Sequence, residues 1–149
     1  EGLGLTALQP NAGNGKGVSV VSTIGELGVP FRTAEDTDAD IEWLCGKVAR
    51  LRIFDDENGV MNLDIQQTGG EVLVVSQFTL YASTKKGNRP SYIRSAGEAF
   101  ARPMYEKFLA TLSGVVGSEV EHGEFGADMK VSLVNDGPVT ICIDSKNRE

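Results

Sequence analysis

Hydrophobic residues at helical spacing mark the clearest element of the chain. They recur every three or four positions and are Ile41, Leu44, Cys45, Val48 and Leu51. This spacing gives a helix with one apolar face. Asp36 or Thr37 can cap its first turn, where the acidic residues that follow complement the positive end of the helix dipole. The pattern therefore predicts an amphipathic helix that ends near Leu51.

A second helix is predicted from about Arg102-Pro103, because proline is tolerated in the first turn of a helix. Its apolar positions again follow helical spacing. The positions that we expect to be buried are Met104, Tyr105, Phe108, Leu109 and Leu112.

Short apolar runs between turn residues predict strands. They cover Leu51–Phe54, Val60–Ile65, Glu71–Ala82, Val131–Val134 and Val139–Ile143. The Asn58-Gly59 pair favours a tight reversal after the first run. Val72 to Val75 are almost continuously hydrophobic, which is typical of a central strand covered on both faces.

The first 36 residues have a different composition. Seven glycines fall between Gly2 and Gly28, and Pro10 and Pro30 interrupt the segment. Only Val18–Val21 has the pattern of a short strand. At 149 residues the chain is the size of one domain, so we predict a single domain over residues 1–149 with an atypical segment 1–36. Strands and two main helices without regular alternation predict an α+β fold with a mixed or antiparallel sheet, or a partial barrel.

Composition narrows the possible functions. The net charge of −7 argues against a protein that coats nucleic acid, and the 40% hydrophobic content is globular. Cys45 and Cys142 lack neighbours at metal-ligand spacing, so we expect buried free thiols, no metal and no cofactor. We expect no membrane span and no signal peptide, which favours the cytoplasm.

Positive charge is concentrated in one interval. No acidic residue lies between Glu71 and Glu98, whereas Lys85, Lys86 and Arg89 do. We call residues 84–90 the basic loop. It could hold a phosphate-bearing end of a ligand, or its charges could simply keep an exposed loop solvated.

Hydroxyl, amide and aromatic groups interrupt the long apolar run at Ser76, Gln77, Phe78 and Thr79. Burying such groups without partners costs about one to a few kcal/mol each, so they either pair with one another, bind a ligand, or face water at the strand end. His122 is the single histidine, and its acidic surroundings indicate a surface residue. A Ser-His or Cys-His catalytic system is therefore hard to build.

Two further segments have the composition of a site. Asn135-Asp136-Gly137-Pro138 is a turn signal, and its rigid Gly-Pro element could present fixed carbonyl acceptors to a ligand. Phe125-Gly126-Ala127-Asp128-Met129 could line a flat pocket for a base, or could belong to the edge of the core.

Five blocks together resemble the D-aminoacyl-tRNA deacylase family, in that family's order and spacing over roughly three-quarters of the chain. They are Leu51-Arg52-Ile53-Phe54, Val74-Val75-Ser76-Gln77-Phe78-Thr79-Leu80, Lys86-Gly87-Asn88-Arg89-Pro90, Phe125-Gly126-Ala127-Asp128-Met129-Lys130-Val131 and Asn135-Asp136-Gly137-Pro138-Val139-Thr140. The resemblance implies a homodimeric hydrolase that cleaves the ester between a D-amino acid and the terminal ribose of tRNA, and that in many members also removes glycine.

The resemblance also implies roles for residues. The catalytic site would combine Ser76, Gln77, Phe78 and Thr79 with Gly137 and Pro138 of the partner subunit, the Gly-Pro pair excluding L side chains. Phe125 and Met129 would flank the terminal adenosine, Asn135 would also bind the substrate, and Lys85, Lys86 and Arg89 would hold the phosphates. The family route uses the ribose 2′-hydroxyl and backbone N–H groups near Phe78 and Thr79; Thr79 as a nucleophile is the competing assignment.

The resemblance departs at the start of the chain. Family members usually open with a strand containing Gln-Arg-Val, whose arginine helps to orient the Gly-Pro element. This chain has Ala7-Leu8-Gln9-Pro10-Asn11, with proline in place of that arginine. A binding module for the tRNA end with impaired catalysis is therefore the alternative function.

Overall fold

A five-stranded sheet forms the centre of the computed structural model, which describes residues 2–11, 17–25, 36–133 and 139–148. The strand order is β6-β5-β2-β1-β7. The bounds are Gly2–Asn11 for β1, Gly17–Gly25 for β2, Glu71–Ser76 for β5, Glu121–His122 for β6 and Ile141–Ile143 for β7. A separate hairpin pairs β3 (Phe54–Asp55) with β4 (Met61–Leu63).

The sheet is mixed, as the sequence predicted. β1 runs antiparallel to both β2 and β7, whereas β2 and β5, and β5 and β6, are parallel. β6 and β7 form its two edges, so the described strands do not close into a barrel. The α+β class is confirmed, and the partial-barrel alternative gives way to an open sheet.

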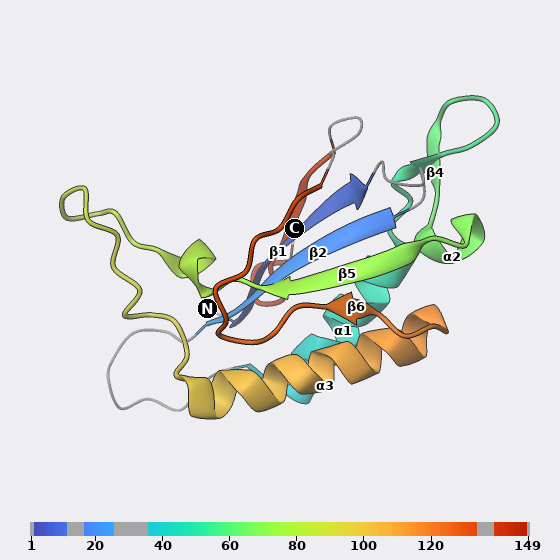
Figure 1. Ribbon diagram of the computed structural model, residues 1–149. Coiled ribbons are helices and arrows are strands. Elements are labelled where there is room, and N and C mark those ends of the chain that lie inside the picture. Colours follow the sequence, from blue (N-terminus) through green and yellow to red (C-terminus); the bar gives the residue numbers. More distant parts are fainter. Residues whose placement is uncertain (1, 12–16, 26–35, 134–138, 149) are drawn as a thin grey trace.

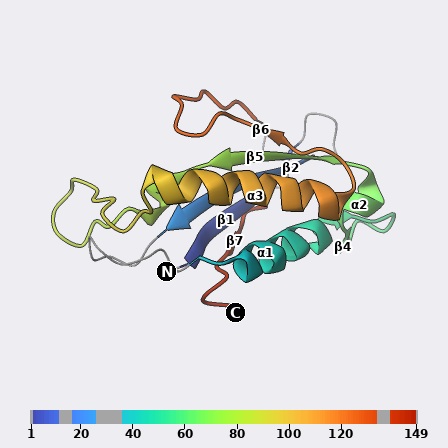
Figure 2. The ribbon, with the colours of Figure 1, turned by 90° about the horizontal axis from the view of Figure 1, so that it is seen from below.

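Two long helices cover one face of this sheet (Figures 1 and 2). α1 spans Asp38–Arg50 and α3 spans Glu98–Val116, and a single turn, α2, spans Ile65–Thr68. Thr37 caps α1, because its backbone N–H and hydroxyl both donate to the carboxylate of Asp40, at 2.9 and 2.8 Å. The predicted first helix and its cap are therefore confirmed.

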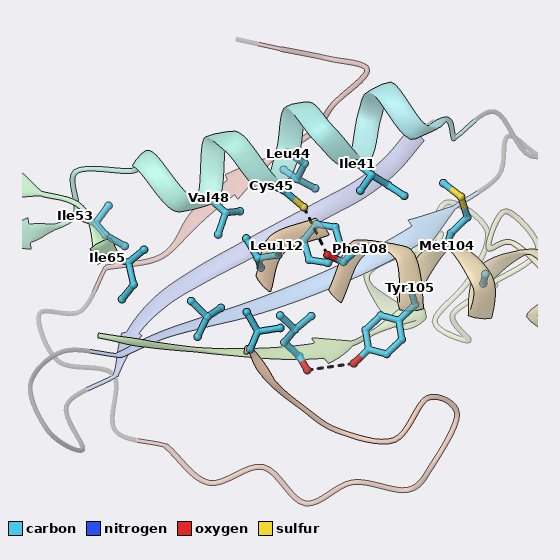
Figure 3. Close-up of a cluster of buried hydrophobic side chains, with 14 of the residues drawn as sticks. Ile41, Leu44, Cys45, Val48, Ile53, Ile65, Met104, Tyr105, Phe108 and Leu112 are labelled. Carbon is cyan, nitrogen blue, oxygen red and sulfur yellow. Dashed lines mark hydrogen bonds between the residues drawn. The ribbon is translucent and has the colours of Figure 1, made fainter. Parts of the chain in front are cut away.

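The core lies where the two helices meet each other and β5 (Figure 3). The largest fully buried side chains are Phe108, Ile41, Leu44, Leu112, Val74 and Cys45. The Cys45 thiol donates to the Phe108 carbonyl at 3.7 Å, and the Tyr105 hydroxyl donates to the Val74 carbonyl at 3.3 Å. Val74 and Val75 are both buried although successive strand residues face opposite sides, so β5 is covered on both faces as predicted.

Several predicted boundaries were wrong. β3 and β4 are shorter than the runs Leu51–Phe54 and Val60–Ile65, and Ile65 begins α2 because Asp64 caps that turn by accepting from Gln67 N–H at 2.9 Å. Residues 131–133 form no strand and are exposed. Cys142 is also exposed, which corrects the expectation of two buried thiols.

The start of α3 and the N-terminal segment were also predicted incorrectly. α3 begins at Glu98, ahead of Pro103, because the N–H groups of Phe100 and Ala101 already bond to the Gly97 carbonyl at 3.1 and 2.9 Å. In the N-terminal segment the structure has two long strands, β1 and β2, where only Val18–Val21 was predicted. Glycine and proline obscure the pattern there, and pairing with β5 and β7 supplies the missing order.

Candidate active site

A cavity of about 430 Å³ opens at the end of β5. Three parts of the chain that are distant in sequence form its walls: the end of β5 with the residues after it, the first half of α3, and the segment that follows β6 (Figure 1). Its lining includes Ser76, Gln77, Phe78, Tyr105, Phe125 and Met129. The structure therefore brings together five predicted site residues from two blocks, and Tyr105 joins them.

The first wall turns away from the sheet after Ser76. The parallel pairing of β5 with β2 ends at Ser76, so the backbone that follows forms local hydrogen bonds instead, in a 3₁₀ helix, η1, over Phe78–Tyr81. The predicted strand through Thr79 and on to Ala82 was therefore wrong beyond Ser76. Gln77 Nε2 donates to the Thr79 hydroxyl, so these two polar side chains pair with each other.

The second wall is a stack of aromatic and charged groups. The centroids of the Phe125 and Tyr105 rings lie 5.5 Å apart. The guanidinium of Arg102, a residue of α3, lies 4.9 Å from the Phe125 centroid. Arg102 Nη2 also pairs with Glu98 Oε1 at 2.5 Å. Cation–π contact and ring packing together fix the orientation of Phe125 at the cavity.

Apart from the carboxylates of Glu98 and Asp128, the cavity offers few groups for acid–base chemistry. The hydrogen bond that Arg102 donates to Glu98 raises the pKa of Arg102, and burial raises the pKa of the Tyr105 hydroxyl, so both keep their protons near neutral pH. His122 is exposed, with Nδ1 2.8 Å from the Gly123 carbonyl oxygen, and is not part of the lining. Among the described residues, no group of three or more His, Cys, Asp or Glu could hold a metal ion.

The basic loop lies apart from the cavity. Lys85, Lys86 and Arg89 are exposed, and hydrogen bonds of 2.8 and 2.9 Å between the backbones of Ser83 and Ser91 close the loop at its base. The loop projects to one side of the sheet in both views (Figures 1 and 2). Three predicted substrate-binding residues are thus not part of the cavity wall.

Exposed apolar side chains lie in η1 and in the segment that precedes α3. Phe78 is 55% exposed and Ile93 74%, and the Tyr92 ring contacts Phe78 edge-on at 5.2 Å between centroids. Ser95 Oγ donates to the Phe78 carbonyl at 3.2 Å, which ties this segment to η1. We call Phe78, Tyr92 and Ile93 the rim patch.

The structure leaves some predicted residues aside and adds others. Asn135, Gly137 and Pro138 lie outside the described residues. Thr79 is not part of the cavity lining, whereas Glu98, Ala101 and Tyr105 are. Sequence reasoning missed these three as site residues, although their spacing of three and four positions puts them on one helix face.

No helix in the described part of the chain is long and apolar enough to cross a membrane. The model of one protein family, described as D-Tyr-tRNA(Tyr) deacylase, matches residues 19–144. That range contains every cavity-lining residue. β1 lies outside the match, in agreement with the departure seen in the sequence.

Related proteins and structures point in the same direction. A D-aminoacyl-tRNA deacylase of Bacteroides fragilis is 64% identical over 117 residues, covering 77% of this chain and 78% of the relative. One from Bacteroides thetaiotaomicron is 56% identical over 135 residues, covering 91% and 85%.

Two solved structures share the fold. A c-Myc DNA unwinding element binding protein superposes with a TM-score of 0.81 at 30% identity, over 94% of this chain and 97% of that one. A probable eukaryotic D-amino acid tRNA deacylase superposes with a TM-score of 0.71 at 16% identity, over 95% of each chain, which supports the fold alone.

Proposed function

Because the chain belongs to the D-Tyr-tRNA(Tyr) deacylase family, we propose that it hydrolyses the ester between a D-amino acid and the terminal ribose of tRNA. One observation carries the proposal. The fold joins Ser76, Gln77 and Phe78 to Phe125 and Met129 around one cavity, across about fifty residues of intervening sequence. Such a site suits proofreading of charged tRNA, and we place it in the cytoplasm, where aminoacyl-tRNA is used.

The cavity has the size and polarity that such a ligand needs. A volume of about 430 Å³ is within the range of small-molecule sites, and aromatic walls can stack on a base. Glu98 and Asp128 also line it, and their charge disfavours phosphate inside. The aminoacyl-adenosine end therefore fits the cavity, while the phosphates of the acceptor end fit Lys85, Lys86 and Arg89 on the basic loop.

The proposed mechanism relies on backbone groups and on the substrate. Water adds to the ester carbonyl carbon, and the oxygen that becomes negative accepts hydrogen bonds from the N–H groups of Phe78 and Thr79, which open η1 and lack acceptors within it. The bond to the ribose 3′-oxygen then breaks, and that oxygen takes up the proton that water lost. The adjacent 2′-hydroxyl relays this proton, so no protein base is required.

Selectivity depends on a second copy of the chain in this proposal. The Gly137-Pro138 element of the partner subunit closes the cavity, accepts hydrogen bonds from the substrate's α-amino group and leaves no room for an L side chain. Glycine has no side chain and passes the same filter. The exposed rim patch beside the cavity supports a homodimer, because a second copy would bury it.

Purified protein incubated with D-tyrosyl-tRNA and L-tyrosyl-tRNA tests the proposal. We expect hydrolysis of the D form alone, and hydrolysis of glycyl-tRNA in a third reaction. Pro138→Ala should abolish turnover while the melting temperature stays close to that of the wild type. Salt-sensitive tRNA binding without hydrolysis would instead identify a binding module, and equal hydrolysis of the two tyrosyl forms would exclude chiral editing.

A further inference from the structure

Gly123 lies so close to Met129, a cavity-lining residue, that any side chain at position 123 would overlap the methionine. A Cβ built on Gly123 would lie 2.2 Å from the Met129 sulfur, whereas ordinary van der Waals contact begins near 3.4 Å. Met129 lines the cavity, and Gly123 directly follows β6. The methionine thioether therefore occupies the space that a side chain at position 123 would need.

The backbone of Gly123 is not free to move aside. Its N–H donates to the Val74 carbonyl at 3.3 Å, directly after the parallel pairing of Val74 with His122. The same carbonyl accepts the Tyr105 hydroxyl at 3.3 Å, so strand, helix and glycine are joined at one oxygen. Because position 123 is anchored, a clash there has to be relieved by Met129.

Met129 can move, and the open space beside it is the cavity. Methionine is unbranched, and its thioether changes rotamer at little cost. We propose that Gly123 is a positioning residue. Because it has no side chain, Met129 can lie against the wall, and the adenosine end of the cavity stays open. Gly123→Ala would push the thioether into that space and leave the chemistry at Ser76 to Thr79 untouched.

A spectroscopic experiment tests this independently of catalysis. The chain has three methionines, Met61, Met104 and Met129, so methyl-¹³C-methionine labelling gives a simple spectrum. In Gly123→Ala we expect the Met129 signal alone to move. Gly114→Ala is the matched control, since it adds the same methyl group where no atom other than its chain neighbours and the nearby backbone of α3 lies within 4 Å, and we expect it to leave all three signals in place.

The kinetic arm rests on the proposed function and uses D-tyrosyl-tRNA. Gly123→Ala should raise KM on the order of tenfold while kcat stays within about twofold, because binding and not the chemical step is impaired. Gly123→Ala/Met129→Ala should show no penalty beyond Met129→Ala alone, because the clash has gone.

Several outcomes would overturn the inference. One is an unmoved Met129 signal in Gly123→Ala, and another is additive penalties in Gly123→Ala/Met129→Ala. A third is unfolding of Gly123→Ala and of Gly123→Ala/Met129→Ala, which would assign Gly123 a backbone role. Wild-type protein that hydrolyses neither tyrosyl-tRNA would contradict the proposed function, while the methyl spectrum would still decide the placement of Met129.

Discussion

Two groups of apolar side chains in this molecule have opposite surroundings. Between α1, α3 and β5, Phe108, Leu44 and Leu112 are at most 1% exposed. In the rim patch, Phe78 and Ile93 are more than half exposed although they are equally hydrophobic. Contacts within the chain bury the first group, because the helices pack it against the sheet (Figure 3).

The difference separates residues that make the fold from residues that make the site. The rim patch adjoins the cavity through Phe78, which belongs to both. An apolar patch kept exposed beside a cavity is suited to a partner, and in the proposed enzyme that partner is a second copy of the chain. The helix layer should therefore control stability, and the rim patch should control assembly and activity.

Truncating the same residue type in both groups gives the largest contrast. Phe108→Ala should lower the free energy of unfolding by about 3 to 5 kcal/mol, because it leaves a cavity in a packed core. Phe78→Ala should cost about 1 kcal/mol, chiefly its edge-on contact with Tyr92. Urea unfolding at low protein concentration measures both, and equal costs would show that Phe78 is buried in the species present in solution.

The helix layer is also the part that the sequence predicted best. Regular apolar spacing defines α1 and α3, since a helix needs only local hydrogen bonds and one apolar face. Phe108 and Leu112 as core residues followed from that spacing, and Thr37 was one of two residues predicted as the cap, beside Asp36. Only the start of α3 was misplaced, where Gly97 supplies the first acceptor ahead of Pro103.

The surroundings of the cavity were harder to predict, because pairing partners decide them. β5 ends at Ser76 only because its ladder with β2 ends there, and no feature of Gln77 to Ala82 reveals it. Residues 131–133 are apolar enough for a strand but lie outside the sheet. Ser76 and Gln77 were singled out because polar groups in an apolar run need a reason, and the segment with Phe125 and Met129 because of its aromatic and thioether side chains; all four line the cavity.

Assembly gives the next largest effect. Ile93→Ser should weaken self-association by about 3 kcal/mol per dimer, because each copy loses a buried isoleucine side chain. Sedimentation over a range of concentrations measures the shift. Val60→Ser is the matched control, since Val60 is 57% exposed and lies between β3 and β4, in the hairpin that is separate from the five-stranded sheet. Equal association of both variants with the wild type would remove the rim patch from the interface.

A polar contact reinforces the helix layer to a smaller extent. Lys146 Nζ lies 2.6 Å from Asp40, whose side chain is 4% exposed, and this pair holds the C-terminal segment on α1. Asp40→Asn should cost about 2 kcal/mol, because it removes a charge-assisted bond from a buried site. Asp38→Asn is the control in the same turn. Its pair with Lys107 is about half exposed, so its loss should cost less than about 1 kcal/mol.

The pH dependence of the Asp40 contribution has a definite sign. Burial alone would raise the pKa of Asp40, but hydrogen bonds from Lys146 and Thr37 outweigh it and lower the pKa from the usual 3.8. A lowered pKa in the folded state means that the stabilisation is complete above about pH 4 and is lost as pH falls through the folded-state value. Wild type and Asp40→Asn should therefore converge in stability below pH 3.8, and a constant gap down to pH 2 would contradict this assignment.

The smallest expected effect concerns Thr79, the second residue of η1. Its hydroxyl accepts a hydrogen bond from the Gln77 amide, which cannot act as a base, so it is a poor nucleophile. Thr79→Ala should keep kcat for D-tyrosyl-tRNA within about threefold of the wild type, because the N–H of residue 79 is unchanged. A loss of a thousandfold or more, restored by Thr79→Ser, would instead make the hydroxyl the attacking group and replace the RNA-assisted route.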